Sequence, residues 1–131
     1  MLLDIGVGIL SALFASSLSN VELSLGLISF ALISSLLPDI DTLSHIQQGC
    51  SIDSHKRHEH RDFCHYPLLY IPLGTLIISY FSPLYGFLFA LTSFLHFLHD
   101  SIGIGWGIQW LYPFSRKHFS IIFLTSLLIA L

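Results

Sequence analysis

Five runs of apolar and small residues follow one another along the chain, with short polar segments between them. They lie at about residues 2–18, 23–37, 67–81, 84–99 and 119–131. Each is shorter than the roughly 20 residues of a standard membrane-spanning helix, so flanking residues would have to add a turn. The last run could instead lie at the membrane interface. The pattern predicts an all-α fold, a polytopic membrane helical bundle of four to five short transmembrane helices in a single domain, residues 1–131.

The spacing of the runs predicts how the helices are connected. Only a few residues separate the first run from the second, at 19–22, and the third from the fourth, at 82–83. Such short connections join helices that run antiparallel to each other. We therefore expect two helical hairpins, with longer polar loops after the second and fourth helices.

Composition supports a membrane protein. The chain is 53% hydrophobic and 10% charged, with a mean hydropathy of +0.76. Soluble domains carry about 25% charged residues, so this chain has too little polar surface to cover itself in water. The net charge of −3 offers no basic face, and we expect no nucleic-acid partner.

The positions of the basic residues predict an orientation. All five Lys and Arg side chains lie in the two longer loops, and neither hairpin turn contains one. By the positive-inside rule these loops are cytoplasmic, which predicts a multi-pass protein of the cell membrane with its polar motif loops on one, cytoplasmic, face. Cys50 and Cys64 lie in the first of these loops, so we expect no disulfide.

The first candidate site follows the second apolar run, in the sequence LLPDID. Pro38 is expected to close or bend the helix, and Asp39 and Asp41 to project from an extended turn. Carboxylates at a helix C-terminus oppose the helix dipole, so a cation is needed to offset them. That cation could be a metal ion, or Lys56 or Arg57 at a solvated helix end.

Histidines form two further candidate sites. In the first loop His60 and His65 could bind a metal or form a pH-sensitive, solvated segment. In the fourth run His96 and Asp100 are four residues apart and share one helix face, either as part of a site or as a hydrogen-bonded tie between helices. His99 is offset around the helix and is not expected to point the same way as both.

Residues 103–115 combine three glycines with two tryptophans and a tyrosine. This composition is typical of a re-entrant or interfacial loop that shapes a substrate pocket, and equally of an aromatic belt at the membrane surface. The sequence leaves both interpretations open.

The clusters are expected to meet on one face of the bundle and to bind one or two divalent ions. Histidine with carboxylate suits zinc, manganese, iron or nickel better than calcium or magnesium, and we expect zinc first. A hydrolytic centre needs three or four such ligands and an open position for water. The candidate metal ligands are Asp39, Asp41, His60, His65, His96 and Asp100.

The order of these motifs resembles the YdjM-like family of LexA-regulated, inner-membrane proteins described as metal-dependent hydrolases. That family carries Leu-Pro-Asp-Ile-Asp-His, then His-Arg-Gly-Phe-Thr-His-Ser, a helix with His-x-x-x-Asp, and a stretch ending in an aromatic residue and proline. The matching segments here are Leu37–Asp41, His60–Tyr66, His96–Asp100 and Leu111–Pro113. Thr42 replaces the last histidine of the first motif. The family's N-terminal histidine is missing, and Asp4 is the nearest candidate for its place.

The resemblance implies a membrane-bound metal-dependent hydrolase, with the six candidate ligands as metal or catalytic residues. We expect Asp41, His96 and Asp100 to act in catalysis, and Arg61 or Arg116 to bind a substrate phosphate. A site at the membrane face favours a membrane lipid or another amphiphilic phosphoester as substrate.

Two other functions compete with this interpretation. One is a structural membrane protein held together by His–Asp ties, and the other is a metal transporter or sensor. A transport site should lie near the middle of the membrane, but the middles of the apolar runs lack acids and histidines. The sequence leaves the oligomeric state open, since so small a chain could complete its site in a homo-oligomer.

Overall fold

The computed structural model describes residues 2–40, 66–102 and 108–120, and this part of the chain is helical. The only β-structure within it is an isolated bridge between Ile108 and Phe119. The predicted all-α class is therefore confirmed for these residues. The helices are α1 (Leu2–Ser19), α2 (Leu25–Leu36), the short 3-10 helix η1 (Leu37–Asp39), α4 (Pro67–Phe81) and α5 (Pro83–Ile102).

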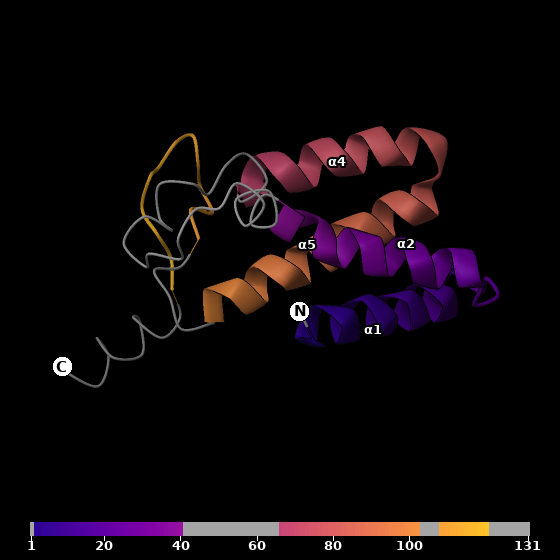
Figure 1. Cartoon of the computed structure of the whole chain (residues 1–131). Helices are drawn as coiled ribbons and strands as arrows, with labels where there is room; N and C mark the ends of the chain where they lie inside the picture. The colour runs from indigo at the N-terminus through magenta and orange to yellow at the C-terminus, as the bar shows by residue number, and fades with distance from the viewer. Residues whose placement is uncertain (1, 41–65, 103–107, 121–131) are drawn as a thin grey trace.

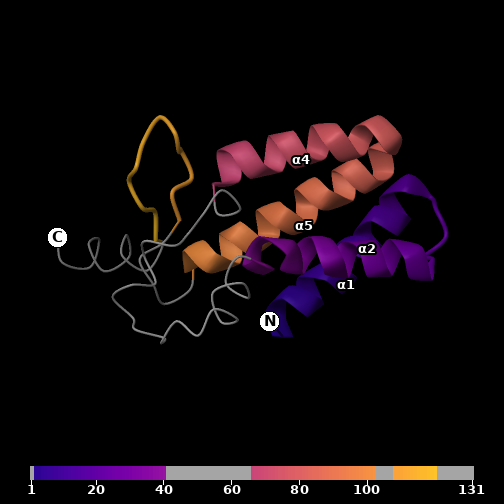
Figure 2. The same ribbon diagram turned by 45° about the horizontal axis from the view of Figure 1, so that its top comes forward.

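Helix α5 is the centre of the arrangement (Figure 1). It packs against α4 on one side and against both α1 and α2 on the other, while α1 and α2 also pack against each other. Figure 2 shows the same order of helices after a rotation. The segment 108–120 projects at the end of the bundle where α5 finishes and α4 begins.

Local sequence explains the turn between α1 and α2. Asn20 adopts a left-handed conformation with φ 50°, which asparagine tolerates better than most residues, and the backbone N–H of Val21 donates to Ser16 O at 3.1 Å. The side chain of Ser24 then accepts a hydrogen bond from Leu27 N at 3.2 Å. This N-cap starts α2 at Leu25, two residues later than the apolar run predicted.

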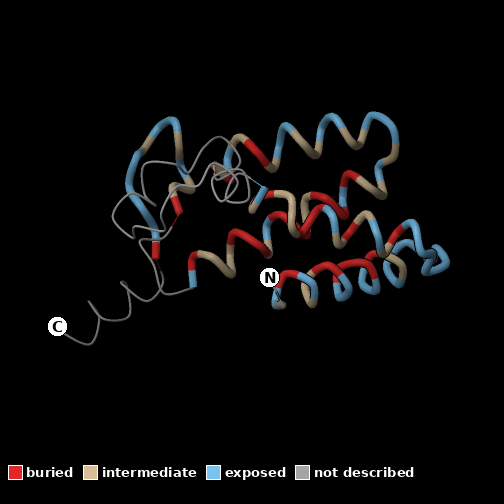
Figure 3. The backbone as a smooth tube through the Cα atoms, viewed as in Figure 1, coloured by how far each residue is buried: buried red, intermediate tan, exposed pale blue. Residues whose placement is uncertain are grey.

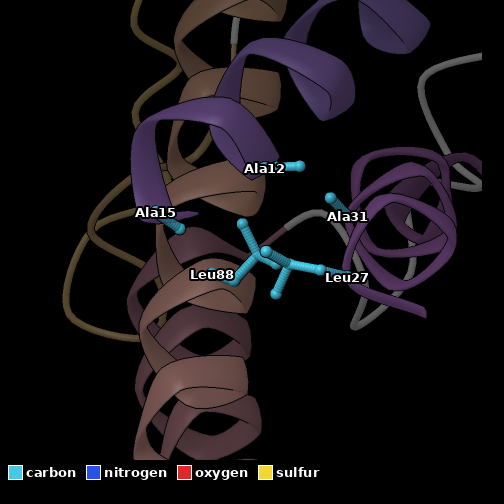
Figure 4. Packing of buried hydrophobic residues seen from close by; sticks show 5 residues of the cluster. All are labelled: Ala12, Ala15, Leu27, Ala31 and Leu88. Atoms are coloured by element: carbon cyan, nitrogen blue, oxygen red, sulfur yellow. The ribbon is translucent and has the colours of Figure 1, made fainter. Parts of the chain in front are cut away.

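Small residues let the helices approach closely. Ala12 and Ala15 of α1 face Leu27 and Ala31 of α2, with Leu88 of α5 between them (Figure 4). Buried residues lie on the inward faces of the helices, and the outer faces are exposed (Figure 3). Several of the buried residues are polar, among them Ser11, Ser34, Ser35, Thr92 and Ser93. Small and hydroxyl-bearing residues at helix contacts are typical of membrane proteins.

Within residues 2–40, 66–102 and 108–120, no helix combines the length and apolar character that a membrane crossing requires. Helices α2 and α4 have 12 and 15 residues, fewer than the about 20 of a standard span. The predicted transmembrane helices are thus not found in this part of the chain. Most of the fifth predicted run, from residue 121 onward, lies outside the described residues.

Candidate metal centre

Three segments that are distant in sequence bring charged side chains to one end of the bundle. Asp4 lies in the first turn of α1, Asp39 ends η1, and His96 lies near the end of α5. Because α1 and α2 form an antiparallel hairpin, the start of α1 and the end of α2 meet at the same end of the bundle. Helix α5 packs against both and also finishes there (Figure 1).

His96 is the centre of this cluster. Its side chain is 1% exposed, and its two ring nitrogens face different carboxylates. Nδ1 lies 3.1 Å from Asp4 Oδ1, and Nε2 lies 3.7 Å from Asp39 Oδ1. Neither ring nitrogen makes a hydrogen bond of regular geometry with the described residues. Buried polar atoms in native proteins nearly always have a partner. Nδ1 has the Asp4 carboxylate at 3.1 Å, so Nε2, 3.7 Å from the nearest carboxylate oxygens, is the nitrogen placed to bind a ligand.

Two further side chains surround His96. Asp100, one turn later on α5, places Oδ2 3.7 Å from His96 Nε2, as the four-residue spacing predicts. His99 Nδ1 lies 3.7 Å from Asp4 Oδ1 and 3.9 Å from Asp100 Oδ1. His99, offset around the helix from His96, thus joins the cluster through Asp4 and Asp100.

The backbone before Asp39 differs in part from the prediction. Helix α2 ends at Leu36, in agreement with the expectation that Pro38 closes or bends the helix, but residues 37–39 form a 3-10 turn in place of an extended turn, and Ile40 is still helical (φ −67°, ψ −29°). Proline is tolerated in the first turn of a helix, because its missing N–H would have no partner there and its fixed φ suits helical backbone. The tighter turn carries Asp39 onto the side where His96 lies.

Asp4, Asp39 and His96 could hold a metal ion. One ligand atom from each lies within 4.8 Å of the other two. Zinc bound at about 2.0–2.2 Å would bring such atoms to about 3.3 Å from one another, which small side-chain rotations can achieve. One imidazole and two carboxylates are also ligands that zinc, manganese and iron accept. The donor set therefore fits a divalent metal.

Burial raises the free-energy cost of the carboxylate charges in the cluster. The side chain of Asp4 is only 3% exposed, in a helix with no other charged residue, while those of Asp39 and Asp100 are 38% and 24% exposed. An ionised carboxylate without water is costly unless positive charge lies close to it. A cation between Asp4, Asp39 and His96 would offset that cost, so metal binding and folding should favour each other.

The structure brings together three of the six predicted ligands: Asp39, His96 and Asp100. It adds Asp4, for which a signal is present in the sequence, because Asp4 is the only charged residue before Glu22. It also adds His99. The remaining predicted site residues of the first loop, namely Asp41, His60, Arg61 and His65, lie outside the described residues.

A model of the family of YdjM inner membrane proteins matches residues 4–131 of this chain. The chain belongs to the YdjM family. The match begins at Asp4 and spans every residue of the cluster. No curated protein and no solved structure matched the sequence.

Membership of the YdjM family supports a location in the inner membrane. The family is one of inner membrane proteins, which agrees with the membrane assignment made from composition. The ligand cluster of this YdjM-family chain is built from α1, η1 and α5, and the last two carry the family-like Leu-Pro-Asp and His-x-x-x-Asp motifs.

Proposed function

We propose that this protein is a membrane-bound metal-dependent hydrolase that acts on an amphiphilic phosphoester at the cytoplasmic face of the membrane. The observation that carries the proposal is the convergence of Asp4, Asp39 and His96, with ligand atoms within 4.8 Å of one another around a buried imidazole. Asp41, His60 and His65 are proposed to complete the centre from the first loop.

A divalent ion held by these residues, zinc first or else manganese, iron or nickel, would supply Lewis acidity and make a bound water more acidic. Asp100 is proposed as the general base. Its carboxylate is partly exposed, so water can reach it, and it lies 3.7 Å from His96 Nε2. The more buried Asp4 faces the opposite nitrogen, Nδ1, and orients the imidazole ring.

The substrate proposal rests on location and charge. A site at one end of a bundle from an inner membrane family can receive a phosphate head group from the water side while the tails stay among apolar helices. Arg116 is exposed on the segment that packs on the end of α5, and Arg61 lies in the first loop. A guanidinium on either residue could bind the phosphate in a bidentate manner.

The reaction can be tested with the protein in lipid nanodiscs. Phosphate release would be measured from phosphatidic acid and from a polyprenyl phosphate, before and after removal of metal with EDTA and after return of zinc or manganese. We expect turnover that requires the metal and that falls at least about 100-fold in Asp100→Asn, within the range attributed to general acid–base catalysis.

Measuring the metal content of variants distinguishes the proposed general base from the proposed metal ligands. Asp100→Asn should keep its metal, whereas Asp39→Ala should lose it together with activity. Glu22→Gln, an exposed change in the turn between α1 and α2, is the matched control and should behave as the wild type. Turnover that persists after EDTA in a protein shown to be metal-free would refute the mechanism.

One observation favours a second function. The 3.1 Å contact between Asp4 and His96 joins α1 to α5 and would serve as a structural tie without any metal. A purely structural role predicts that EDTA leaves the melting temperature of the wild type unchanged, and that Asp4→Ala destabilises the protein to the same extent with and without metal.

A further inference from the structure

Residues 108–119 form a closed hairpin, here called the 108–119 hairpin. Ile108 and Phe119 exchange both backbone hydrogen bonds, at 3.1 and 2.9 Å. Gln109 Nε2 and His118 Nε2 lie 2.9 Å apart across the pair. At the tip, Ser115 N donates to Leu111 O at 2.9 Å. These bonds fix the shape of the loop.

The base of the hairpin is fixed to the bundle. Trp110 Nε1 donates to Ser101 Oγ of α5 at 2.8 Å, and its ring meets Phe94 edge-on at 5.8 Å. Ile108 is buried beside Phe97. Because Ser101 is next to Asp100, the hairpin is held at the end of the bundle that carries the candidate metal centre (Figures 1 and 2).

A second contact links the hairpin to α4. Tyr112 stacks on Tyr66, with ring centroids 3.9 Å apart and planes 16° from parallel. Tyr66 is the N-cap residue of α4. The hairpin therefore bridges the start of α4 and the end of α5, and its tip keeps a defined position relative to both helices.

The tip combines exposed apolar and basic side chains. Phe114 is 88% exposed and Leu111 is 47% exposed. Other phenylalanines and leucines of the chain, such as Phe97 and Leu27, are buried in the bundle. Arg116 and Lys117 follow directly and are exposed as well. They are the only Lys or Arg among residues 2–40, 66–102 and 108–120, in a chain of net charge −3.

We infer that the 108–119 hairpin docks on an anionic lipid bilayer, with Phe114 and Leu111 inserted at the level of the head groups and with Arg116 and Lys117 bound to lipid phosphates. Aromatic and aliphatic side chains flanked by basic residues are the features that interfacial segments use. The charge of the tip favours anionic lipid as its partner, because basic residues are attracted to a membrane surface rich in anionic lipid. Membership of an inner membrane family places such a surface within reach.

The docking can be measured with a fluorescent probe at the tip. Phe114→Cys, in a chain carrying Cys50→Ser and Cys64→Ser, would be labelled with an environment-sensitive dye and placed in nanodiscs. One set of discs contains phosphatidylglycerol and phosphatidylethanolamine, and the other contains phosphatidylcholine alone. Lipids brominated close to the glycerol report contact by quenching. Because Phe114 is almost fully exposed, its replacement should leave the bundle folded, which circular dichroism checks.

We expect quenching in the anionic discs to be at least twofold stronger than in phosphatidylcholine discs. The double variant Arg116→Gln with Lys117→Gln should lower it to the phosphatidylcholine level, and so should 1 M salt, at which charges are screened within about 3 Å. Lys117→Arg keeps the charge and is the matched control, which should quench as strongly as the parent.

Two results would overturn the inference. One is a tip probe that reports bulk water in both kinds of disc. The other is energy transfer between two labelled copies without lipid quenching, which would make a second copy of this chain the partner. All measurements are made in EDTA, so that their outcome is independent of the proposed metal centre and of hydrolysis.

Discussion

Asp4 is the only charged residue of α1 and belongs to the candidate site. It stands near the start of a helix whose other residues are apolar or small and uncharged, and it is buried against His96. A buried carboxylate in such surroundings is costly and is retained where it has a function. Its place among the three residues whose ligand atoms cluster supports a role in the metal centre.

Replacing Asp4 should therefore affect metal binding. We expect Asp4→Ala to weaken binding by at least about 10-fold, whether Asp4 binds the ion directly or orients His96, since loss of an orienting partner alone costs 10–100-fold. Asp4→His restores a ligating side chain and should retain more affinity than Asp4→Ala. Competition with a chelating dye measures both variants, and equal affinities in all three proteins would contradict the role.

His99 allows a test of which imidazole belongs to the centre. Its side chain is 39% exposed and it is not one of the three residues whose ligand atoms cluster, whereas His96 is. We expect His96→Ala to lose the metal and His99→Ala to keep it with less than about a threefold change in affinity. The two histidines are three residues apart on one helix and so form a matched pair. Equal losses in both variants would show that the centre is assigned to the wrong histidine.

At this scale the sequence predicts contacts within a helix well and contacts between helices poorly. The pairing of His96 with Asp100 follows from their spacing alone. The contact of Asp4 with His96 joins residues 92 positions apart, and only the packing of α1 on α5 creates it. The contact of His99 with Asp4 is likewise one between helices, which spacing within α5 cannot predict.

At the scale of elements, the bundle depends on close approach between α4 and α5. A Cβ at Gly86 would overlap with the side chain of Ser79, and a Cβ at Gly74 would overlap with the ring of Phe89, which is itself buried. Gly8 serves α1 and α2 in the same way, since a Cβ there would lie 3.1 Å from Leu32 Cα. These glycines set the distances between the helices and thereby the position of the end of α5.

Gly86→Ala should thus destabilise the fold. Overpacking of a tight contact costs about 1–3 kcal/mol, which exceeds the gain in helix propensity of up to about 1 kcal/mol. Gly6→Ala in α1 is the matched control, because nothing lies within 4 Å of a Cβ at that position. Titration with SDS in mixed micelles measures the free energy of unfolding. A Gly86→Ala protein as stable as Gly6→Ala would contradict the packing.

Helix ends were predicted with unequal success, for local reasons. Prolines at 67 and 83 occupy the first positions of α4 and α5, where proline is favoured. The third predicted run also begins at 67, and the fourth begins one residue after Pro83. The start of α2 was set too early because Ser24 caps the helix from within a continuous run. Helix α2 does end just before Pro38, at Leu36, but a 3-10 turn follows in place of the expected extended turn.

For the whole molecule, the distribution of charge predicts how the chain is oriented in the membrane. We propose that the loops with Lys and Arg face the cytoplasm and that the turn containing Glu22 faces the other side. A membrane-impermeant maleimide applied to intact spheroplasts should leave Cys50 and Cys64 unlabelled until the membrane is permeabilised. Glu22→Cys in a chain without these cysteines should react at once. The opposite labelling pattern would invert the orientation.

The proposed ion also joins three elements of the molecule, and this has a thermodynamic consequence. A ligand that binds only the folded state stabilises it by about 2.7 kcal/mol at a concentration 100 times its dissociation constant. We expect EDTA to lower the melting temperature of the wild type, and to have no effect on Asp39→Ala. Circular dichroism in detergent records both. An Asp39→Ala protein that responds to EDTA as the wild type does would place the metal elsewhere.

We propose that Asp4, Asp39 and His96 hold a metal ion where α1, η1 and α5 meet. Elemental analysis of the purified protein by plasma mass spectrometry tests it most directly, in the wild type, in Asp4→Ala, in Asp39→Ala and in the control Glu22→Gln, each shown to be folded. We expect close to one ion per chain of zinc, manganese, iron or nickel in the wild type and the control, and its loss from both site variants. A wild-type protein that stays metal-free after reconstitution with each of these ions would show that Asp4, Asp39 and His96 do not form a metal site.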